Sequence, residues 1–327
     1  MMTAAPQRTM TAREWGLLAL LSLLWGGSFF FIGVGVKEFP PLTLVALRVG
    51  LAAALLLAFA PILGARLPKN AHALAALAIL GFGNNVLPFA LIAWGQTRLA
   101  SGLAAILNAS TPLFSVVAAH FLTGEEKLSA LKLIGAVAGF AGVAWLLGPG
   151  LVTGTGADLL AELAVLGAAL SYALFAIYGR RMLALGLKPI DVATGQATAA
   201  TAFLAPLALA IDRPWTLPAP SASAIASVLA LAAFSTALAY VVYFRILAGA
   251  GATNVLLVTL LVPLTSVVLG ALVLHEQLIA RQFLGFGLVA LGLAFIDGRL
   301  PRAVGRQLKN TRGAPSHFRL PLGKRPR

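Results

Sequence analysis

The chain has 327 residues, of which 60% are hydrophobic and 10% charged, and its formal net charge is +14. The core of a soluble protein of this length cannot bury so much apolar surface, so most of it is expected to face lipid. The absence of cysteine excludes disulfides, thiolate catalysis and the usual zinc sites. The basic residues lie mainly in short connections and near the C-terminus, a distribution that indicates membrane orientation and not a nucleic-acid partner.

Ten apolar segments are each about long enough to cross the roughly 30 Å of bilayer hydrocarbon. The expected fold class is therefore all-α and integral to the membrane, with ten transmembrane helices. The first segment follows Arg8 and Arg13 but is too long for a signal peptide, so we expect it to be retained. In chain order the segments are residues 17–36, 42–63, 73–94, 101–122, 131–147, 159–178, 192–211, 224–247, 254–274 and 282–296.

The lysines and arginines predict the orientation of these segments. Of the 24 in the chain, nineteen fall on one side of the predicted membrane, four on the other, and Arg48 lies inside a span. Both termini of this multi-pass protein are therefore expected in the cytoplasm. Residues 299–327 are expected to form a basic cytoplasmic tail.

The second half of the chain resembles the first at an offset of about 150 residues. Each half holds five predicted spans, an odd number, so the second half must enter the membrane from the opposite side. We therefore predict two inverted five-helix repeats, residues 13–148 and 158–298. The matched positions are Pro41 and Pro189, Arg48 and Gln196, Asn84-Asn85 and Ser235-Thr236, Pro112 and Pro263, Glu125 and Glu276, Gly135 and Gly285, and Gly142 and Gly292.

Three short motifs carry a family resemblance. They are LWGGSF at 24–29, TP at 111–112 followed by TGEE at 123–126, and VP at 262–263 followed by LHE at 274–276. With them the chain resembles the EamA-type members of the drug/metabolite transporter superfamily over about residues 15–297. The resemblance implies a ten-helix carrier that exports metabolites such as amino acids, with YddG-like amino-acid exporters as nearer relatives. His275 departs from the pattern, because the first half has Gly124 at the matching position.

Polar residues inside the spans are the candidate substrate-binding residues, because lipid penalises them and a wet cavity does not. Ser101, Asn108 and Ser115 recur every seven residues, so they form a polar stripe along one face of the fourth span. In the ninth span, Thr259 and Ser266 occupy the positions that match Asn108 and Ser115. Hydrogen bonding between packed helices is the alternative explanation of such a stripe. The full candidate set is Trp25, Ser28, Asn84, Asn85, Asn108, Thr111, Tyr172, Ser235, Thr236, Tyr240 and Thr259.

Aromatic residues spaced by three extend this set. Trp25 and Ser28 in the first span, and Tyr172 and Phe175 in the sixth, are expected to form an aromatic and polar wall. Packing within the bundle or contact with lipid is an equally good account of these aromatic residues.

An arginine, two prolines and two glutamates in or beside the spans can be interpreted as structural or as functional residues. Arg48 is expected to snorkel or to form a structural ion pair, with a bidentate contact to a substrate carboxylate as the alternative. Pro112 and Pro263 are candidate hinges, or static kinks. Glu125 and Glu276 are expected to stabilise the N-termini of the helices that follow them.

The glycine run in the fifth span permits close helix packing, and we expect it to act within the bundle and not across a dimer.

These patterns favour a secondary transporter of small solutes that acts as a monomer in the lipid bilayer, without catalytic residues, cofactor or metal. A drug-efflux carrier for lipophilic compounds and a membrane-embedded enzyme are the alternatives. An enzyme needs a nucleophile, a metal site or a carboxylate pair, and none can be assembled here. A receptor or scaffold needs large extramembrane domains, which these spans do not leave room for.

Overall fold

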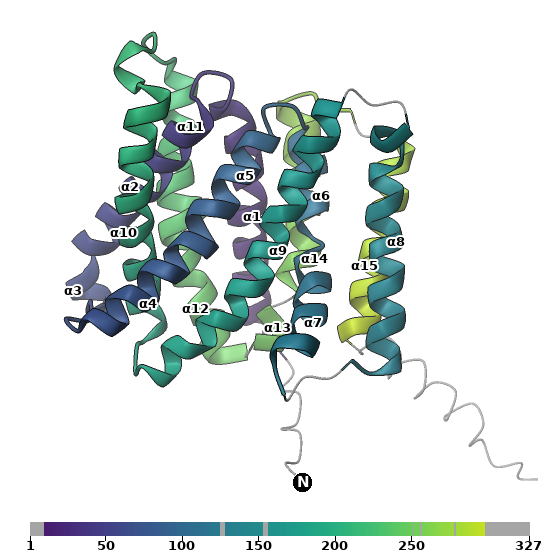
Figure 1. Cartoon of the computed structure of the whole chain (residues 1–327), viewed down its shortest axis with the longest axis horizontal. Helices are drawn as coiled ribbons and strands as arrows, with labels where there is room; N and C mark the ends of the chain where they lie inside the picture. The colour runs from purple at the N-terminus through teal and green to yellow at the C-terminus, as the bar shows by residue number, and fades with distance from the viewer. Residues whose placement is uncertain are drawn as a thin grey trace, which may run out of the picture.

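The computed structural model describes residues 10–124, 128–152, 156–250, 252–255, 257–277 and 279–297. These residues form a bundle of helices, and none of them lies in a strand (Figure 1). The α-helices are α1 (Ala12–Gly35), α2 (Pro41–Ala58), α3 (Ala60–Leu63), α4 (Ala71–Gly81), α5 (Leu87–Gly95), α6 (Ser101–Asn108), α7 (Thr111–Leu122), α8 (Ala130–Val152), α9 (Gly156–Ala184), α10 (Pro189–Leu207), α11 (Ala222–Ala232), α12 (Ala239–Ala250), α13 (Ala252–Val255), α14 (Val258–Val273) and α15 (Ala280–Asp297). Three π-helical turns, η1 (Phe82–Val86), η2 (Ala208–Asp212) and η4 (Ala233–Leu238), and one 3-10 turn, η3 (Pro214–Thr216), join or extend them.

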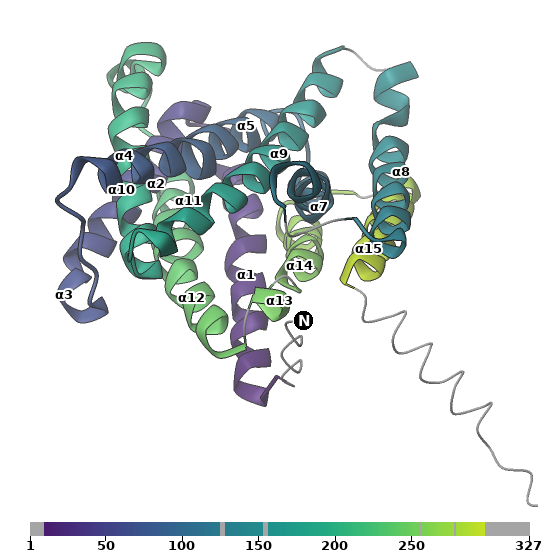
Figure 2. The same ribbon diagram turned by 60° about the horizontal axis from the view of Figure 1, so that its bottom comes forward.

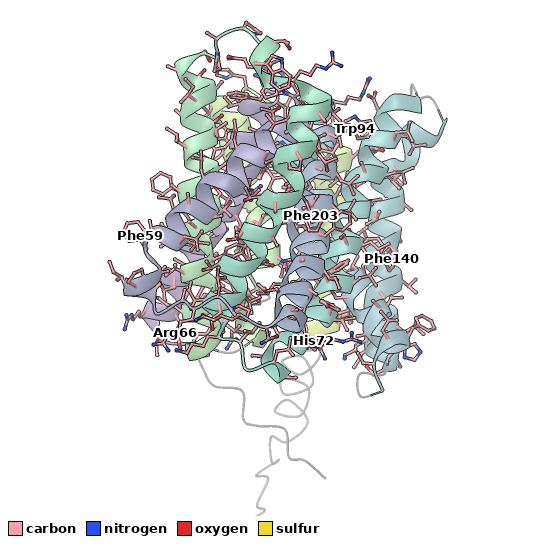
Figure 3. The ribbon with its side chains drawn as sticks, turned by 60° about the vertical axis from the view of Figure 1, so that its left-hand side comes forward. Phe59, Arg66, His72, Trp94, Phe140 and Phe203 are labelled. Atoms are coloured by element: carbon pink, nitrogen blue, oxygen red, sulfur yellow. The ribbon has the colours of Figure 1, made fainter. Side chains whose placement is uncertain are left out.

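The described residues of each predicted apolar segment are mostly helical. Within the described residues, eight helices are long and apolar enough to cross a membrane, and Val258–Val273 and Ala280–Ile296 are shorter apolar helices. Large hydrophobic side chains cover the outside of the bundle, among them Phe203 and Phe59, and Figure 3 shows Phe59 at the edge of the bundle. Trp94 lies toward one end of the bundle, and Arg66 and His72 lie toward the other (Figure 3). This exterior suits a lipid environment with an aromatic residue near one interface.

Local sequence signals set where the helices begin. Thr11 and Glu14 form a capping box at the start of α1, and Asn70 and Ser221 accept the free N–H groups of α4 and α11. Pro41 is at the first turn of α2, where its missing N–H leaves no bond unmade.

The fourth predicted span is two helices, α6 and α7, separated at Ala109 and Ser110. Pro112 lies in the first turn of α7, so the chain breaks where the sequence predicts an interruption. Pro263 differs, because α14 continues through it. Pro263 therefore lies inside an unbroken helix, and α13 ends at Val255 before α14 begins at Val258.

Helices α8 and α15 pack side by side at one edge of the bundle, as both views show (Figures 1 and 2). A Cβ on Gly135 would lie 2.6 Å from the carbonyl oxygen of Gly292, and one on Gly142 would lie 2.8 Å from that of Gly285. The two helices run antiparallel, so each glycine meets the repeat counterpart of the other: Gly135 meets Gly292, which matches Gly142, and Gly142 meets Gly285, which matches Gly135. The glycine run therefore acts within the bundle, as expected.

Acidic residues hold helix N-termini across the two halves of the chain. The Glu38 carboxylate accepts hydrogen bonds from the backbone N–H of Ser221 at 2.7 Å and from its hydroxyl at 2.6 Å. Asp212 accepts from the N–H and hydroxyl of Thr43 at 2.7 and 2.8 Å. The hydroxyl and N–H of Ser221 hold the pKa of the exposed Glu38 carboxyl below its usual value.

Candidate functional site

Two helices of the bundle widen into π-helical turns at matching positions of the repeat. Turn η1 joins α4 to α5 and η4 joins α11 to α12, at an offset of 151 residues between Phe82 and Ala233. Each turn lies about half-way along its span, Ala71–Gly95 or Ala222–Leu247. Such turns are frequent at functional sites because they redirect side chains out of the regular helical register.

Glycines let other helices approach η1 closely. A Cβ on Gly81 would lie 2.7 Å from the backbone oxygen of Gln196 in α10, and one on Gly83 would overlap the ring of Phe175 in α9. The hydroxyl of Ser171 donates to the carbonyl of Gly83 at 2.5 Å. Helices α9 and α10 of the second half therefore press directly on the π-turn of the first half.

Polar side chains of the two turns bond across the halves of the chain. Arg48 Nε in α2 donates to Thr236 Oγ1 in η4 at 3.0 Å, and Asn84 Nδ2 in η1 donates to Gln196 Oε1 in α10 at 3.1 Å. Arg48 matches Gln196 in the repeat, and each lies on the second helix of its half. In both halves that helix bonds to the π-turn of the other half: α2 to η4, and α10 to η1. A third bond runs from the hydroxyl of Tyr240 to Asn85 Oδ1 at 2.9 Å.

Two buried polar groups in these turns have no hydrogen-bond partner. Asn85 is 1% exposed and its Nδ2 has no partner, and the hydroxyl of Ser235, also 1% exposed, has none either. Buried polar groups without partners are uncommon in folded proteins and point to a ligand or water. The cluster of Arg48, Asn84, Asn85, Gln196, Ser235, Thr236 and Tyr240 is called the central cluster below.

The expectation that Arg48 snorkels or forms an ion pair is wrong. Its side chain is 5% exposed and lies over the ring of Phe89, with the guanidinium carbon 3.8 Å from the ring centroid. Its hydrogen-bond partner is the neutral Thr236. The side chain turns inward because η4 supplies an acceptor and Phe89 supplies a π-face for the cation.

Aromatic residues of the predicted wall pack on different helices. Trp25 lies 5.5 Å from Tyr243 of α12, centroid to centroid, whereas Tyr172 lies 6.5 Å from Phe89 of α5. Tyr172 therefore belongs beside the Arg48 and Phe89 pair. Ser28 is buried, at 7% exposed, in the same helix as Trp25.

The polar stripe of the fourth span divides into two parts. The hydroxyl of Ser266 donates to the carbonyl of Ser101 at 3.1 Å, which is the interhelical packing given above as the alternative. Asn108 has a buried Oδ1 without a partner, and Thr111 donates to its backbone carbonyl at 2.7 Å. Thr259 is half-buried in the first turn of α14.

Glu276 stabilises a different helix from the one expected. His275 adopts a left-handed φ of 55°, which ends α14 and turns the carboxylate back toward α6. Glu276 then accepts from the N–H of Ser101 at 2.9 Å and from that of Gly102 at 3.2 Å. The carboxylate thus stabilises the N-terminus of α6 and not that of α15, since α6 presents free N–H groups beside it. Glu125 lies outside the described residues, as does the predicted tail, residues 299–327.

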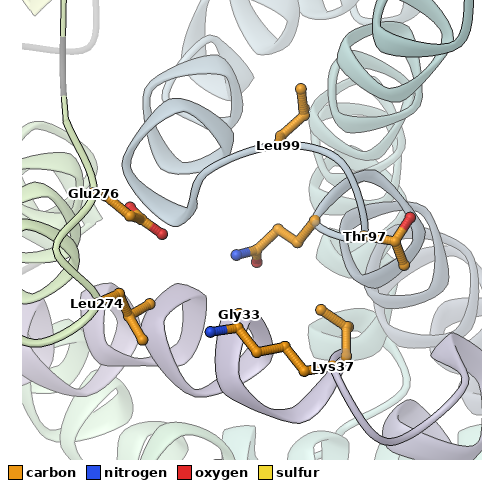
Figure 4. A pocket seen from close by; sticks show the side chains of 8 residues that line it. Gly33, Lys37, Thr97, Leu99, Leu274 and Glu276 are labelled. Carbon is orange, nitrogen blue, oxygen red and sulfur yellow. The ribbon is translucent and has the colours of Figure 1, made fainter.

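A pocket of about 330 Å³ opens beside Glu276, between the ends of α1 and α5 and the turn after α14 (Figure 4). Lys37, Thr97 and Leu274 line it together with Gln96. Gln96 donates from Nε2 to the carbonyl of Phe29 at 2.8 Å, and its buried Oε1 has no partner.

The sequence did not single out Phe89 or Gln96. Phe89 is one of many apolar residues in its span, and only its position against Arg48 distinguishes it. The signal for Gln96 was an amide at the end of an apolar run, a place where polar residues are ordinary.

Comparison with known proteins places this geometry in a family. The model of the EamA-like transporter family matches the chain twice, at residues 14–148 and 159–297. The chain is similar to the uncharacterized inner membrane transporter YedA of Escherichia coli strain K12, at 29% identity over 86% of this chain and 89% of the relative. It is similar to the uncharacterized transporter YoaV of Bacillus subtilis strain 168, at 26% identity over 84% and 92%. A probable amino-acid metabolite efflux pump of E. coli K12 is 28% identical over 86% and 94%.

One solved crystal structure has the same fold, with a TM-score of 0.60 and 20% identity over 88% of this chain and 98% of that chain. The two matches to the family model together span most of the sequence. The protein is a multi-pass membrane transporter and belongs to the EamA-like transporter family.

Proposed function

We propose that this protein is a secondary transporter that exports small metabolites, above all neutral and aromatic amino acids, by alternating access. In this proposal ten helices cross the bacterial inner membrane as two inverted repeats, residues 13–148 and 158–298. Both termini are in the cytoplasm. The observation that carries the proposal is the crossed pairing at half depth: Arg48 with Thr236, and Gln196 with Asn84.

Crossed pairing supports alternating access because the polar groups join the two halves and not the interior of one half. Carriers built from inverted repeats place their substrate near the bilayer midplane, where the repeats meet. Polar groups between the halves can exchange partners with a solute or water when the halves rock. An interface of apolar side chains alone offers no such exchange.

The substrate is placed against the central cluster and the aromatic residues beside it. Amino acids carry both hydrogen-bonding ends and, in many cases, an apolar side chain, which suits amides and hydroxyls next to Tyr172 and Tyr240. One relative is named as a probable amino-acid metabolite efflux pump, which supports the same substrate class. The proposed binding residues are Trp25, Ser28, Asn84, Asn85, Asn108, Thr111, Tyr172, Ser235, Thr236, Tyr240 and Thr259.

Reconstituted flux tests the function directly. Purified protein in proteoliposomes preloaded with an unlabelled amino-acid panel should take up labelled L-phenylalanine by counterflow, and a competing panel of metabolites should rank the substrates. Absence of counterflow with every amino acid in the panel would reject amino-acid transport. Competition only by lipophilic drugs would favour the drug-efflux alternative.

Accessibility to thiol reagents tests the orientation and the site in the same cysteine-free chain. Cysteines at Thr153 and Ser316 should label from opposite faces of intact cells. Cysteines at Asn108 and Thr259 should react with a small water-soluble reagent. If they stay unreactive while the variants still transport, these two residues pack between helices and do not face the solute.

A further inference from the structure

Arg48 has donors that the protein leaves unused. Arginine carries five N–H donors, and the one hydrogen bond of Arg48 to a described residue uses Nε. The edge of the guanidinium that carries Nη1 and Nη2 has no acceptor among the described residues. No carboxylate of the described part of the chain lies within ion-pair distance of it either.

This unpaired charge lies where it is costly. Arg48 is 5% exposed and is eight residues into the 18-residue helix α2, so it lies near the middle of its span. A cation at that depth is unfavourable unless it meets an anion, water or a π-face. Phe89 supplies a π-face on one side of the guanidinium, but no carboxylate among the described residues neutralises the charge.

The described neighbours of Arg48 add hydrogen-bonding groups but no negative charge. The free Nδ2 of Asn85 can only donate, and the Oδ1 of the same amide is already taken by the hydroxyl of Tyr240. Ser235 contributes an unpaired hydroxyl from the turn that holds Thr236. A net positive charge with surplus N–H and O–H groups calls for an anionic ligand rich in acceptors.

We infer that Arg48 binds the carboxylate of the transported solute through Nη1 and Nη2, in an end-on, bidentate contact. The bond to Thr236 and the stack on Phe89 fix the guanidinium plane, so the free edge is oriented before the solute arrives. A planar, two-oxygen carboxylate fits that edge, whereas a simple amine meets only repulsion. This inference rests on the proposed transport function and names its substrate class: solutes with a carboxylate, zwitterionic amino acids among them.

The repeat supports a single carboxylate per solute. The position that matches Arg48 in the second half is Gln196, whose Oε1 is engaged by Asn84. The pseudo-symmetric pair of sites therefore carries one positive charge, so only one end of the solute is held as an anion. A dicarboxylate would leave its second charge against neutral amides.

Matched ligands test the contact without depending on flux. Thermal unfolding of the purified protein in detergent is measured with 3-phenylpropionate, L-phenylalanine and phenethylamine, which carry the acid, both groups and the amine respectively. The two carboxylates should raise the unfolding temperature and the amine should not. Stabilisation by the amine equal to that by the acids, or none by either acid, would overturn the inference.

Substitutions assign the effect to Arg48. Arg48→Gln installs the residue that the second half has at this position and keeps a donor for Thr236, so it should fold. It should raise the half-maximal concentration of both carboxylates by at least about tenfold, since hydrogen bonds to charged groups are the stronger ones. Arg48→Lys keeps the charge without the planar edge and should lose less. Arg245→Gln makes the same change of charge at an exposed position outside the central cluster and should match the parent protein.

Comparison with counterflow separates the two proposals. Carboxylate-dependent stabilisation without flux would leave the Arg48 contact standing and reject transport of these solutes. Flux that tolerates loss of the carboxylate, or an Arg48→Gln variant with unchanged carboxylate affinity, would reject the contact and leave transport standing.

Discussion

A methyl group added to Gly292 should separate α15 from α8. The ideal Cβ of an alanine at this position would lie 2.5 Å from the carbonyl oxygen of Gly135, 2.7 Å from the backbone nitrogen of Gly139 and 2.8 Å from its Cα. All three atoms belong to the backbone of α8, so no side chain can rotate out of the way. Relief of the contact requires the two helices to move apart.

The size of the movement sets the expected cost. Ordinary contacts of a Cβ begin at 3.4 Å, so the carbonyl contact falls short by 0.9 Å. Overpacking of a tightly packed interior typically costs about 1–3 kcal/mol. In a chain of a few hundred residues, each kcal/mol lost from the free energy of unfolding lowers the unfolding midpoint by about 2–4 °C. Gly292→Ala should therefore lower the midpoint by roughly 2–12 °C.

The assay needs a control that separates crowding from helix propensity. Gly287 lies on the same helix with no atom within 4 Å of an added Cβ, so Gly287→Ala should keep the parent midpoint or raise it slightly. Midpoints are measured on purified, monodisperse protein in one detergent by intrinsic fluorescence. Equal midpoints for the two variants would refute the close packing of α8 on α15.

Three further predictions concern the Glu38 carboxylate, the hydrogen bond between Asn84 and Gln196, and the two prolines. Glu38→Gln should lower the unfolding midpoint at pH 7, because donors at the start of α11 hold the pKa of Glu38 below 4.5. The difference in midpoint between the variant and the parent protein should shrink below pH 4.5 and vanish below the native pKa of Glu38. A difference in midpoint that does not depend on pH would contradict this. In a double-mutant cycle, Asn84→Ala and Gln196→Ala should couple by about 0.6 kcal/mol, as interhelical hydrogen bonds in membranes do, and additivity would deny the bond. Replacing Pro112 and Pro263 together with alanine should leave a monodisperse protein that transports more slowly, whereas unchanged counterflow would reject a hinge at either residue.

Much of the fold could be predicted because each span is long and apolar, and the bilayer thickness sets its length. In the part of the chain that the structure describes, the ten apolar segments are mostly helical. The breaks inside them were harder to predict. Pro112 marks a real break, but α14 runs through Pro263. A proline at the start of a helix loses nothing, whereas one in the interior is tolerated when packing holds the helix, and the local sequence does not distinguish the two cases.

The sequence indicated which polar residues of the spans to consider, but not the contacts that they make. Asn84, Asn85, Ser235 and Thr236 were identified because polar residues are costly in lipid, and the structure joins three of them to partners in the other half. The π-turns that aim these side chains have no simple sequence signature. Spacing along the chain also cannot show that Glu276 turns back to α6, because that direction depends on the left-handed conformation of His275.

The repeat indicates why the arginine was misjudged. An isolated arginine two turns from a helix start is expected to reach for the interface, since snorkelling lowers the cost of its charge. The matched residue Gln196 is too short to snorkel, yet it contacts the π-turn of the opposite half. Because an inverted repeat gives matched residues matched surroundings, Gln196 already implied that the side chain at this position points inward. Symmetry thus outweighed the preference of arginine itself, and Arg48 gives the first half of the central cluster a positive charge where the second half has the neutral Gln196.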